Sequence, residues 1–207
     1  AELFSGIYEK AFGSPPVKGT DINFRFDPSL PPEGYKLSVG ENSVTAFASS
    51  QNGGIYAAQT LRQLAGIDYT KGAKILCQEI SDVPRFGWRG VSFDVSRHFF
   101  GAAEIIRFLE HMSLLKLNVL HLHLSDDQGF RVEMEKYPEL NKIGSFRDGT
   151  LLHDGKEHID NVRYGGFYTK DQIRLIVAHA QKLGIDVVPE IDLPGHTVAM
   201  IASLPEL

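Results

Sequence analysis

The chain is poor in cysteine and has no long apolar run. Its 207 residues include one cysteine, which excludes a disulfide within the chain. No apolar stretch reaches the roughly eighteen residues of a membrane-spanning helix. Residues 1–6 also lack the basic, apolar and small-residue order of a secretion signal. We therefore expect a soluble protein from which any export signal has been removed.

Blocks of positive charge and glycosylation acceptors are also absent. The net charge is −5 with mixed signs, so no basic surface for nucleic acid or an anionic membrane is expected. No Asn-x-Ser/Thr acceptor occurs, which favours a bacterial protein, periplasmic or secreted. The one cysteine, Cys77, lies in an apolar run at 74–80, and we expect a small buried side chain there. Nothing predicts a cofactor.

The first part of the chain has the pattern of a small sheet with one helix. Alternating runs at 34–39 and 43–48 flank a turn at 40–42, which predicts antiparallel strands. Apolar residues at helical spacing then predict a helix over 54–64. We interpret residues 1–82 as a compact α+β domain.

The second part, residues 83–207, alternates strands and helices. An extended linker is expected at 82–87, since Pro84 disfavours helix before it. The repeated order of strand, helix and strand along the chain predicts an α/β domain with a parallel sheet. The predicted strands are 90–94, 117–124 and 185–190, and the predicted helices are 102–115 and the segment from the cap Thr169 to Gly184. A loop of about forty residues precedes the second helix, and such loops are usually functional.

Three such units do not close a barrel. A complete (β/α)8 barrel, or TIM barrel, needs about 250 residues. We therefore expect the first three βα units of an incomplete barrel, completed by the rest of the same chain or by a separate chain. Its first and third strands should be unpaired on their outer sides, so the isolated chain should aggregate, oligomerise or bind its complement.

Charged and imidazole side chains gather where these strands end. Because parallel strands end at the same edge, and barrels carry catalytic groups there, these positions are candidates for chemistry. They are Asp94, Arg97, His121, His123, Asp126, Asp127, Glu190, Asp192 and His196.

Structural roles compete with this interpretation. Arg97 could simply pair with Asp94 or Asp126. His121 and His123 share one face of a strand, and we favour two hydrogen-bonded core histidines there. Glu190 and Asp192 could equally cap a helix or anchor a loop. Gly165 and Gly166 are interpreted as a turn before a helix, and the histidines without partner spacing as surface or packing groups: His98, His111, His153, His158 and His179.

Four ordered motifs carry a family resemblance. Residues 89–99, 121–131, 165–169 and 188–196 resemble successive motifs of the family 20 glycoside hydrolases, the β-N-acetylhexosaminidases. Residues 54–64 resemble the helix of the small α+β domain that precedes the barrel in this family. The resemblance covers nearly the whole chain and implies hydrolysis of terminal N-acetylglucosamine or N-acetylgalactosamine from glycans.

The resemblance also implies a substrate-assisted retaining mechanism. The 2-acetamido group of the sugar attacks its own anomeric carbon, an exception to the usual two-carboxylate scheme. An adjacent Asp-Glu pair orients the acetamido group and protonates the leaving oxygen. No Asp-Glu dipeptide occurs in this sequence, and the family places it after the fourth barrel strand, beyond Leu207. We expect no catalytic residue in this chain, which alone should be inactive.

The substrate-holding residues do match the motifs. By resemblance, Arg97 binds the 3- and 4-hydroxyls of the terminal sugar, and Asp126 and His196 lie beside the catalytic acid. Glu190 and Asp192 match further acidic residues with supporting roles. Phe130 stands where many members have Trp.

Two other functions stay open. A metal-dependent barrel hydrolase could use His121, His123, Asp126 and His196 as ligands, although we expect no metal. A sugar-binding module without catalysis is the other, because the Asp-Glu dipeptide is absent. For the N-acetylhexosaminidase and for the sugar-binding module alike, the expected ligand is an amino-sugar oligosaccharide or glycoconjugate.

Overall fold

The computed structural model describes residues 21–66, 75–152 and 158–206 and divides into two compact units. The first unit comprises residues 1–89 together with 112–116, and the second comprises 90–111 together with 117–207. The domain boundary at residue 82 stays a prediction.

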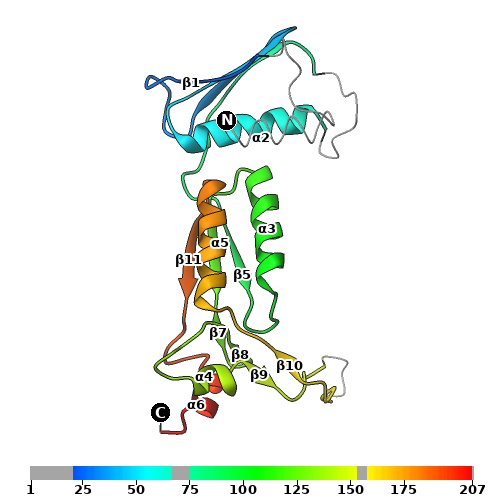
Figure 1. Cartoon of the computed structure of the whole chain (residues 1–207), viewed down its shortest axis with the longest axis vertical. Coiled ribbons are helices and arrows are strands. Elements are labelled where there is room, and N and C mark those ends of the chain that lie inside the picture. Colours follow the sequence, from blue (N-terminus) through cyan, green and yellow to red (C-terminus); the bar gives the residue numbers. More distant parts are fainter. Residues whose placement is uncertain (1–20, 67–74, 153–157, 207) are drawn as a thin grey trace. The chain divides into compact units, whose positions relative to one another are not determined.

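A four-stranded sheet forms one layer of the first unit (Figure 1). Its strands are β1 (Asp21–Phe26), β2 (Tyr35–Val39), β3 (Ser43–Ala48) and β4 (Gln78–Asp82), in the order β1-β3-β2-β4. The predicted β2–β3 pair is antiparallel as expected, but β1 runs parallel to β3. The predicted antiparallel pair is confirmed, and the parallel edge strand β1 was not predicted.

Helix α2 (Gln51–Leu64) forms the second layer and packs on β2 and β3. It begins three residues before the predicted start because the Ser50 hydroxyl caps it, accepting from the Gly53 amide at 3.1 Å. A side chain at Gly53 would meet the Gly34 carbonyl oxygen at 2.5 Å, so the helix lies close against the chain entering β2. Buried Tyr35, Leu37, Ile55 and Leu61 contribute to the core between the layers.

The prediction of a buried Cys77 was wrong. Cys77 is exposed and precedes the edge strand β4. One side of this apolar run faces solvent, so Leu76 is also exposed while Ile80 packs against the core. An edge strand buries fewer of its side chains than a central strand does.

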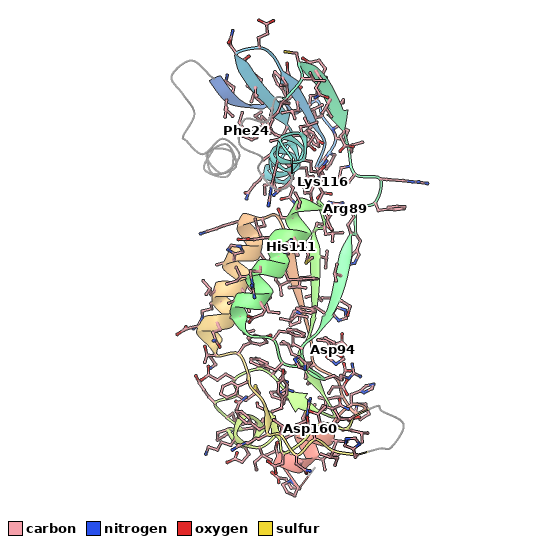
Figure 2. The ribbon with its side chains drawn as sticks, turned by 90° about the vertical axis from the view of Figure 1, so that its right-hand side faces the viewer. Phe24, Arg89, Asp94, His111, Lys116 and Asp160 are labelled. Atoms are coloured by element: carbon pink, nitrogen blue, oxygen red, sulfur yellow. The ribbon has the colours of Figure 1, made fainter. Side chains whose placement is uncertain are left out.

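The second unit contains a parallel sheet with helices on one face. Its strands β5 (Gly90–Asp94), β6 (Val119–His123) and β11 (Asp186–Glu190) lie in the order β11-β6-β5. Helices α3 (Ala102–Leu114) and α5 (Lys170–Lys182) cover the same side of this sheet (Figures 1 and 2). Within the described residues, β5 and β11 each pair on one side only, which confirms the prediction of two open edges.

The register of the sheet separates its two faces. Phe93 stacks on Phe108 of α3 with ring centroids 4.6 Å apart, so its face is the one covered by helices. The alternating neighbours Asp94, His123 and Glu190 are paired across the strands and lie on the opposite face. In a closed barrel that face lines the interior.

The long loop between β6 and α5 contains short elements of its own. They are β7 (Ser125–Asp126), β8 (Gly129–Phe130), α4 (Glu139–Lys142), β9 (Phe146–Arg147) and β10 (Tyr164–Gly165). The predicted cap of α5 is confirmed, since Thr169 and Gln172 form a reciprocal capping box. A short helix, α6 (Val198–Ser203), follows β11. No helix among the described residues combines the length and apolar character needed to cross a membrane.

Candidate active site

The C-terminal ends of the three parallel strands bring together the residues that the sequence singled out. Figure 2 shows Asp94 at the end of β5. We call the group the strand-end cluster and define it as Asp94, Arg97, His123, Asp126, Glu190, Asp192 and His196.

Arg97 lies between two carboxylates. Its Nη1 donates to Oδ2 of Asp94 at 2.6 Å, and its Nη2 lies 2.5 Å from Oδ2 of Asp126. Burial would raise the pKa of Asp94, but the hydrogen bonds from Arg97 outweigh it and hold that pKa below its usual value. The Arg97 side chain is nevertheless 44% exposed. A guanidinium has five N–H donors, so this one can bind a further ligand while it stays paired.

Asp126 is the buried centre of the cluster. Its side chain is only 1% exposed, and it receives contacts from a cation, two imidazoles and a backbone amide. Besides Arg97, these are Nε2 of His123 at 3.1 Å, Nδ1 of His196 at 3.2 Å and the amide of Asp127 at 2.7 Å. Its Oδ1 takes the hydrogen bonds, whereas the buried Oδ2 lies beside Arg97 and His123 and has no partner in hydrogen-bond geometry among the described residues.

His196 has an unusual backbone conformation. Its φ of 56° is in the left-handed region, which few non-glycine residues adopt. The conformation directs Nδ1 to Asp126, while the side chain as a whole is half exposed. A carboxylate beside Nδ1 favours a hydrogen on that nitrogen, which leaves Nε2 as an acceptor towards solvent.

The two β6 histidines differ from each other. His123 is buried, donates from Nε2 to the Ser125 carbonyl at 2.7 Å and places Nδ1 3.5 Å from Glu190, as predicted for a core histidine. His121 contacts Glu190 as well, but its side chain is 37% exposed, so the prediction of a core residue was wrong there. The open face of the sheet leaves His121 uncovered.

Glu190 and Asp192 lie at the end of β11 beside His123. Asp192 is held by its backbone amide, which donates to the Ser125 hydroxyl at 2.9 Å, and its carboxylate is 3.8 Å from His123. Both acids therefore belong to the cluster rather than capping a helix.

The metal-ligand set suggested by the sequence does not form. Within the described part of the chain, the groups whose ligand atoms lie within 4.8 Å of one another are His123 with Glu190 and Asp192, and Asp126 with Asp192 and His196. His121 belongs to neither, so the geometry does not bring together the alternative ligand set of His121, His123, Asp126 and His196. The side chains at the end of the sheet instead pair with one another, carboxylate to imidazole or guanidinium.

Two arginines in the long loop were missed as functional candidates. Arg131 is fully buried and donates to backbone carbonyls, and Arg147 donates to the carbonyl of Arg97 itself. An arginine in a sequence normally predicts an exposed residue. For Arg131, the one signal in the sequence was its position two residues after Gly129, at the end of the second motif.

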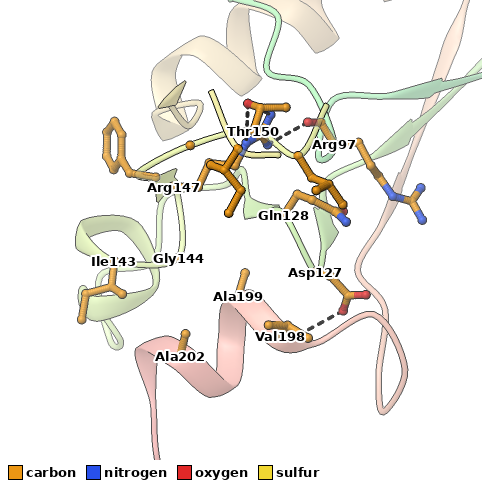
Figure 3. Close-up of a pocket in the computed structure, with 14 residues that line it drawn as sticks. Arg97, Asp127, Gln128, Ile143, Gly144, Arg147, Thr150, Val198, Ala199 and Ala202 are labelled. Atoms are coloured by element: carbon orange, nitrogen blue, oxygen red, sulfur yellow. Dashed lines mark hydrogen bonds between the residues drawn. The ribbon is translucent and has the colours of Figure 1, made fainter. Parts of the chain in front are cut away.

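A cavity of about 630 Å³ lies between the long loop and α6 (Figure 3). Arg97 is the single member of the strand-end cluster among its lining residues. The lining also includes Asp127, Gln128, Ile143, Phe146, Arg147, Thr150, Val198 and Ala199. The cavity is therefore next to the cluster rather than formed by it.

Comparisons with known proteins identify the family. Residues 86–207 match the model of glycosyl hydrolase family 20, catalytic domain, and residues 3–83 match glycosyl hydrolase family 20, domain 2. A β-hexosaminidase from Vibrio furnissii is 38% identical over 192 residues, covering 92% of this chain and 31% of that protein.

Solved structures agree with the sequence matches. The family 20 β-N-acetylhexosaminidase of Streptomyces coelicolor A3(2) has a TM-score of 0.84 at 34% identity, covering 100% of this chain and 42% of that one. The family 20 exo-β-N-acetylglucosaminidase of Vibrio harveyi, solved in complex with N-acetylglucosamine, has a TM-score of 0.82 at 34% identity, covering 100% and 34%. This chain thus spans between 31% and 42% of these three relatives. It belongs to glycosyl hydrolase family 20, of which it contains domain 2 and part of the catalytic domain.

Proposed function

We propose that this chain forms the substrate-holding part of a β-N-acetylhexosaminidase. The reaction is the removal of terminal non-reducing N-acetylglucosamine or N-acetylgalactosamine by the substrate-assisted retaining mechanism. One observation carries the proposal: the half-exposed guanidinium of Arg97 is fixed between Asp94 and Asp126 at the C-terminal end of the sheet. That arrangement presents rigid donors where barrel enzymes bind substrate.

Arg97 fits the recognition of neighbouring sugar hydroxyls. Its planar fork can donate two parallel hydrogen bonds, and the charge makes each stronger than a neutral one. The two carboxylates restrict its rotamers before the sugar arrives, so less side-chain entropy is lost on binding. We assign it to the 3- and 4-hydroxyls of the terminal sugar.

Asp126 and His196 form a pair suited to act beside the catalytic acid. The carboxylate favours the tautomer with its hydrogen on Nδ1, and Nε2 at the exposed edge of the imidazole can then accept a hydrogen bond. Placed next to a glutamic acid, such a pair would tune its pKa. Glu190 and Asp192 support this arrangement through His123.

The catalytic Asp-Glu pair must come from outside these residues. The sequence contains no such dipeptide. We use the term complete enzyme for this chain continued through the rest of a family 20 barrel, including that pair. The proposal predicts that the complete enzyme turns over and that the 207-residue chain alone does not. A bacterial periplasmic or secreted location is part of the proposal, and cell fractionation tests it.

The test is aryl aglycone release from an N-acetyl-β-glucosaminide by Arg97 variants of the complete enzyme. Arg97→Ala should lower kcat/KM at least about a hundredfold, since a charged hydrogen-bond pair is lost, and Arg97→Lys should recover little because it lacks the fork. Arg107→Ala, at an exposed arginine of α3, is the matched control. Wild-type kinetics in Arg97→Ala would refute the assignment.

Binding without catalysis is the second candidate, favoured by the missing dipeptide. Calorimetry with N-acetylglucosamine and the complete enzyme, together with the aryl aglycone assay on the same sample, separates the two functions. If the complete enzyme binds the sugar but has no turnover, the protein is a binding module.

A further inference from the structure

We infer that Arg131 and Arg147 are positioning residues that fix the backbone of Arg97 for sugar recognition. This inference rests on the proposed function and adds two residues that do not themselves contact the sugar. It comes from the hydrogen bonds that the two side chains make to three successive carbonyls, those of Val95, Ser96 and Arg97.

Arg131 is a fully buried cation surrounded by carbonyl oxygens. Its Nε donates to Val95 at 3.1 Å and its Nη2 to Ser96 at 2.7 Å. The other carbonyls that it bonds belong to Gln128, Ser145 and Gly166, at 3.4, 2.6 and 3.1 Å. Five bonds use the donor capacity of a guanidinium. The side chain thereby ties the Arg97 turn to the β8 region and to the chain around β9 and β10.

The surrounding backbone leaves room for this guanidinium. A Cβ at Gly129 would lie 2.1 Å from Cζ of Arg131, and a Cβ at Gly166 would lie 2.4 Å from the ring of Phe99. That ring in turn lies 5.7 Å from the guanidinium carbon, within cation–π distance. Both glycines are therefore required by the packing around Arg131. Burial lowers the pKa of Arg131 to about 10, which still leaves it charged at neutral pH.

Arg147 completes the support from the other side. Its Nη1 donates to the Arg97 carbonyl at 2.8 Å, and Nε and Nη2 donate to the Thr150 hydroxyl at 3.2 and 3.1 Å, as Figure 3 shows. Its guanidinium carbon also lies 5.0 Å from the centre of the Tyr164 ring. Arg147 is only partly buried, so its replacement should not unfold the unit.

The amide side of the same turn is fixed independently. Oδ1 of Asp94 accepts from the amides of Ser96 and Arg97 at 2.9 and 3.1 Å. Carbonyls and amides of the turn are thus both hydrogen-bonded, so the backbone from which the Arg97 side chain extends is fixed. Misplacement of a binding group by about 1 Å can cost on the order of a hundredfold in rate. Loss of one support should have a smaller effect of the same kind.

A double-mutant cycle in the complete enzyme tests this inference. Arg147→Ala should lower kcat/KM about tenfold, the value of one charge-assisted hydrogen bond. In the Arg97→Ala background it should cost nothing further, because its effect passes through Arg97. Arg163→Ala, at an exposed arginine of the same loop, is the control and should leave kcat/KM unchanged.

Lysine variants separate the two arginines. Arg147→Lys should recover most of the lost activity, since one donor suffices for the Arg97 carbonyl, whereas Arg131→Lys should not, because three donors cannot replace five. An equal cost of Arg147→Ala with and without Arg97 would overturn the inference and leave the proposed function intact. If Arg97→Ala itself had no effect, both would be refuted.

Discussion

Removal of the negative charge of Asp126 should lower kcat/KM, because this carboxylate contacts three other groups of the strand-end cluster. Asp126→Asn keeps the shape of the side chain and removes its negative charge. Three groups lose their anionic partner: Arg97 at 2.5 Å, His123 at 3.1 Å and His196 at 3.2 Å. The substitution also brings an NH2 donor against groups that are themselves donors.

The magnitude follows from burial. Breaking a fully buried ion pair costs about 3–5 kcal/mol, and an exposed pair contributes at most about 1 kcal/mol. Asp126 is 1% exposed and Arg97 is 44% exposed, which places this pair between the two limits. We take about 2–3 kcal/mol as the loss in the free energy of unfolding. If the same energy is lost from the positioning of Arg97 in the transition state, at 1.36 kcal/mol for each factor of ten kcat/KM falls about 30- to 150-fold.

The assay is aryl aglycone release by the complete enzyme, with thermal unfolding of each variant measured in parallel. Asp186→Asn is the matched control, because it makes the same change at an exposed position at the opposite end of β11. It should change kcat/KM less than about twofold, as a surface substitution away from any site does. Near wild-type activity in a folded Asp126→Asn enzyme would show that this carboxylate does not hold Arg97 for catalysis, and so would an equal loss in the control.

Three further predictions concern the fold and its pH dependence. Hydrogen bonds from Arg89 and Tyr56 outweigh burial and lower the pKa of Glu33 from 4.5. The ionised carboxylate therefore stabilises the first unit above pH 4.5. This stabilisation is lost as the pH falls through the lower pKa of the folded state. Glu33→Gln should lower the unfolding free energy by about 1.5–3 kcal/mol at pH 7 and make it depend less on acid pH. Urea unfolding from pH 7 to 3 measures both effects. An unfolding free energy with the same pH dependence as the wild type would contradict the prediction. Gly129→Ala should destabilise the chain by about 1–3 kcal/mol in the same assay. Gly87→Ala is the control and should be nearly neutral, because a Cβ at Gly87 meets open space. Equal effects of the two substitutions would argue against close packing of Gly129 on Arg131. His196→Asn should unfold at a higher temperature than His196→Ala, because Asn tolerates the left-handed backbone, while both should lose activity; the reverse order would refute the strain argument.

Local patterns predicted the parallel sheet and its helices well. The strand at 90–94 and the cap at Thr169 follow from hydrophobic runs and capping chemistry, which depend on neighbours in sequence. Edge strands β1 and β4 were missed, and Cys77 was misplaced, because an edge strand shows half of the apolar pattern. Whether β1 runs parallel or antiparallel depends on tertiary pairing, which no local pattern records.

The site was predictable to the extent that strand ends place residues together. Arg97, Asp126 and His196 meet as their positions at the carboxyl ends of parallel strands suggested. Their assigned roles stay predictions. The buried Arg131 could not be found in this way, because its partners are carbonyls from three distant segments and a backbone carbonyl has no sequence signature.

A crystal structure of the complete enzyme with bound N-acetylglucosamine would show whether Arg97 binds the terminal sugar. We expect the terminal sugar over the strand-end cluster, with the Arg97 guanidinium within about 3 Å of two adjacent hydroxyls. A terminal sugar bound without a contact to the Arg97 guanidinium, for example deeper in the cavity between the long loop and α6, would contradict this expectation.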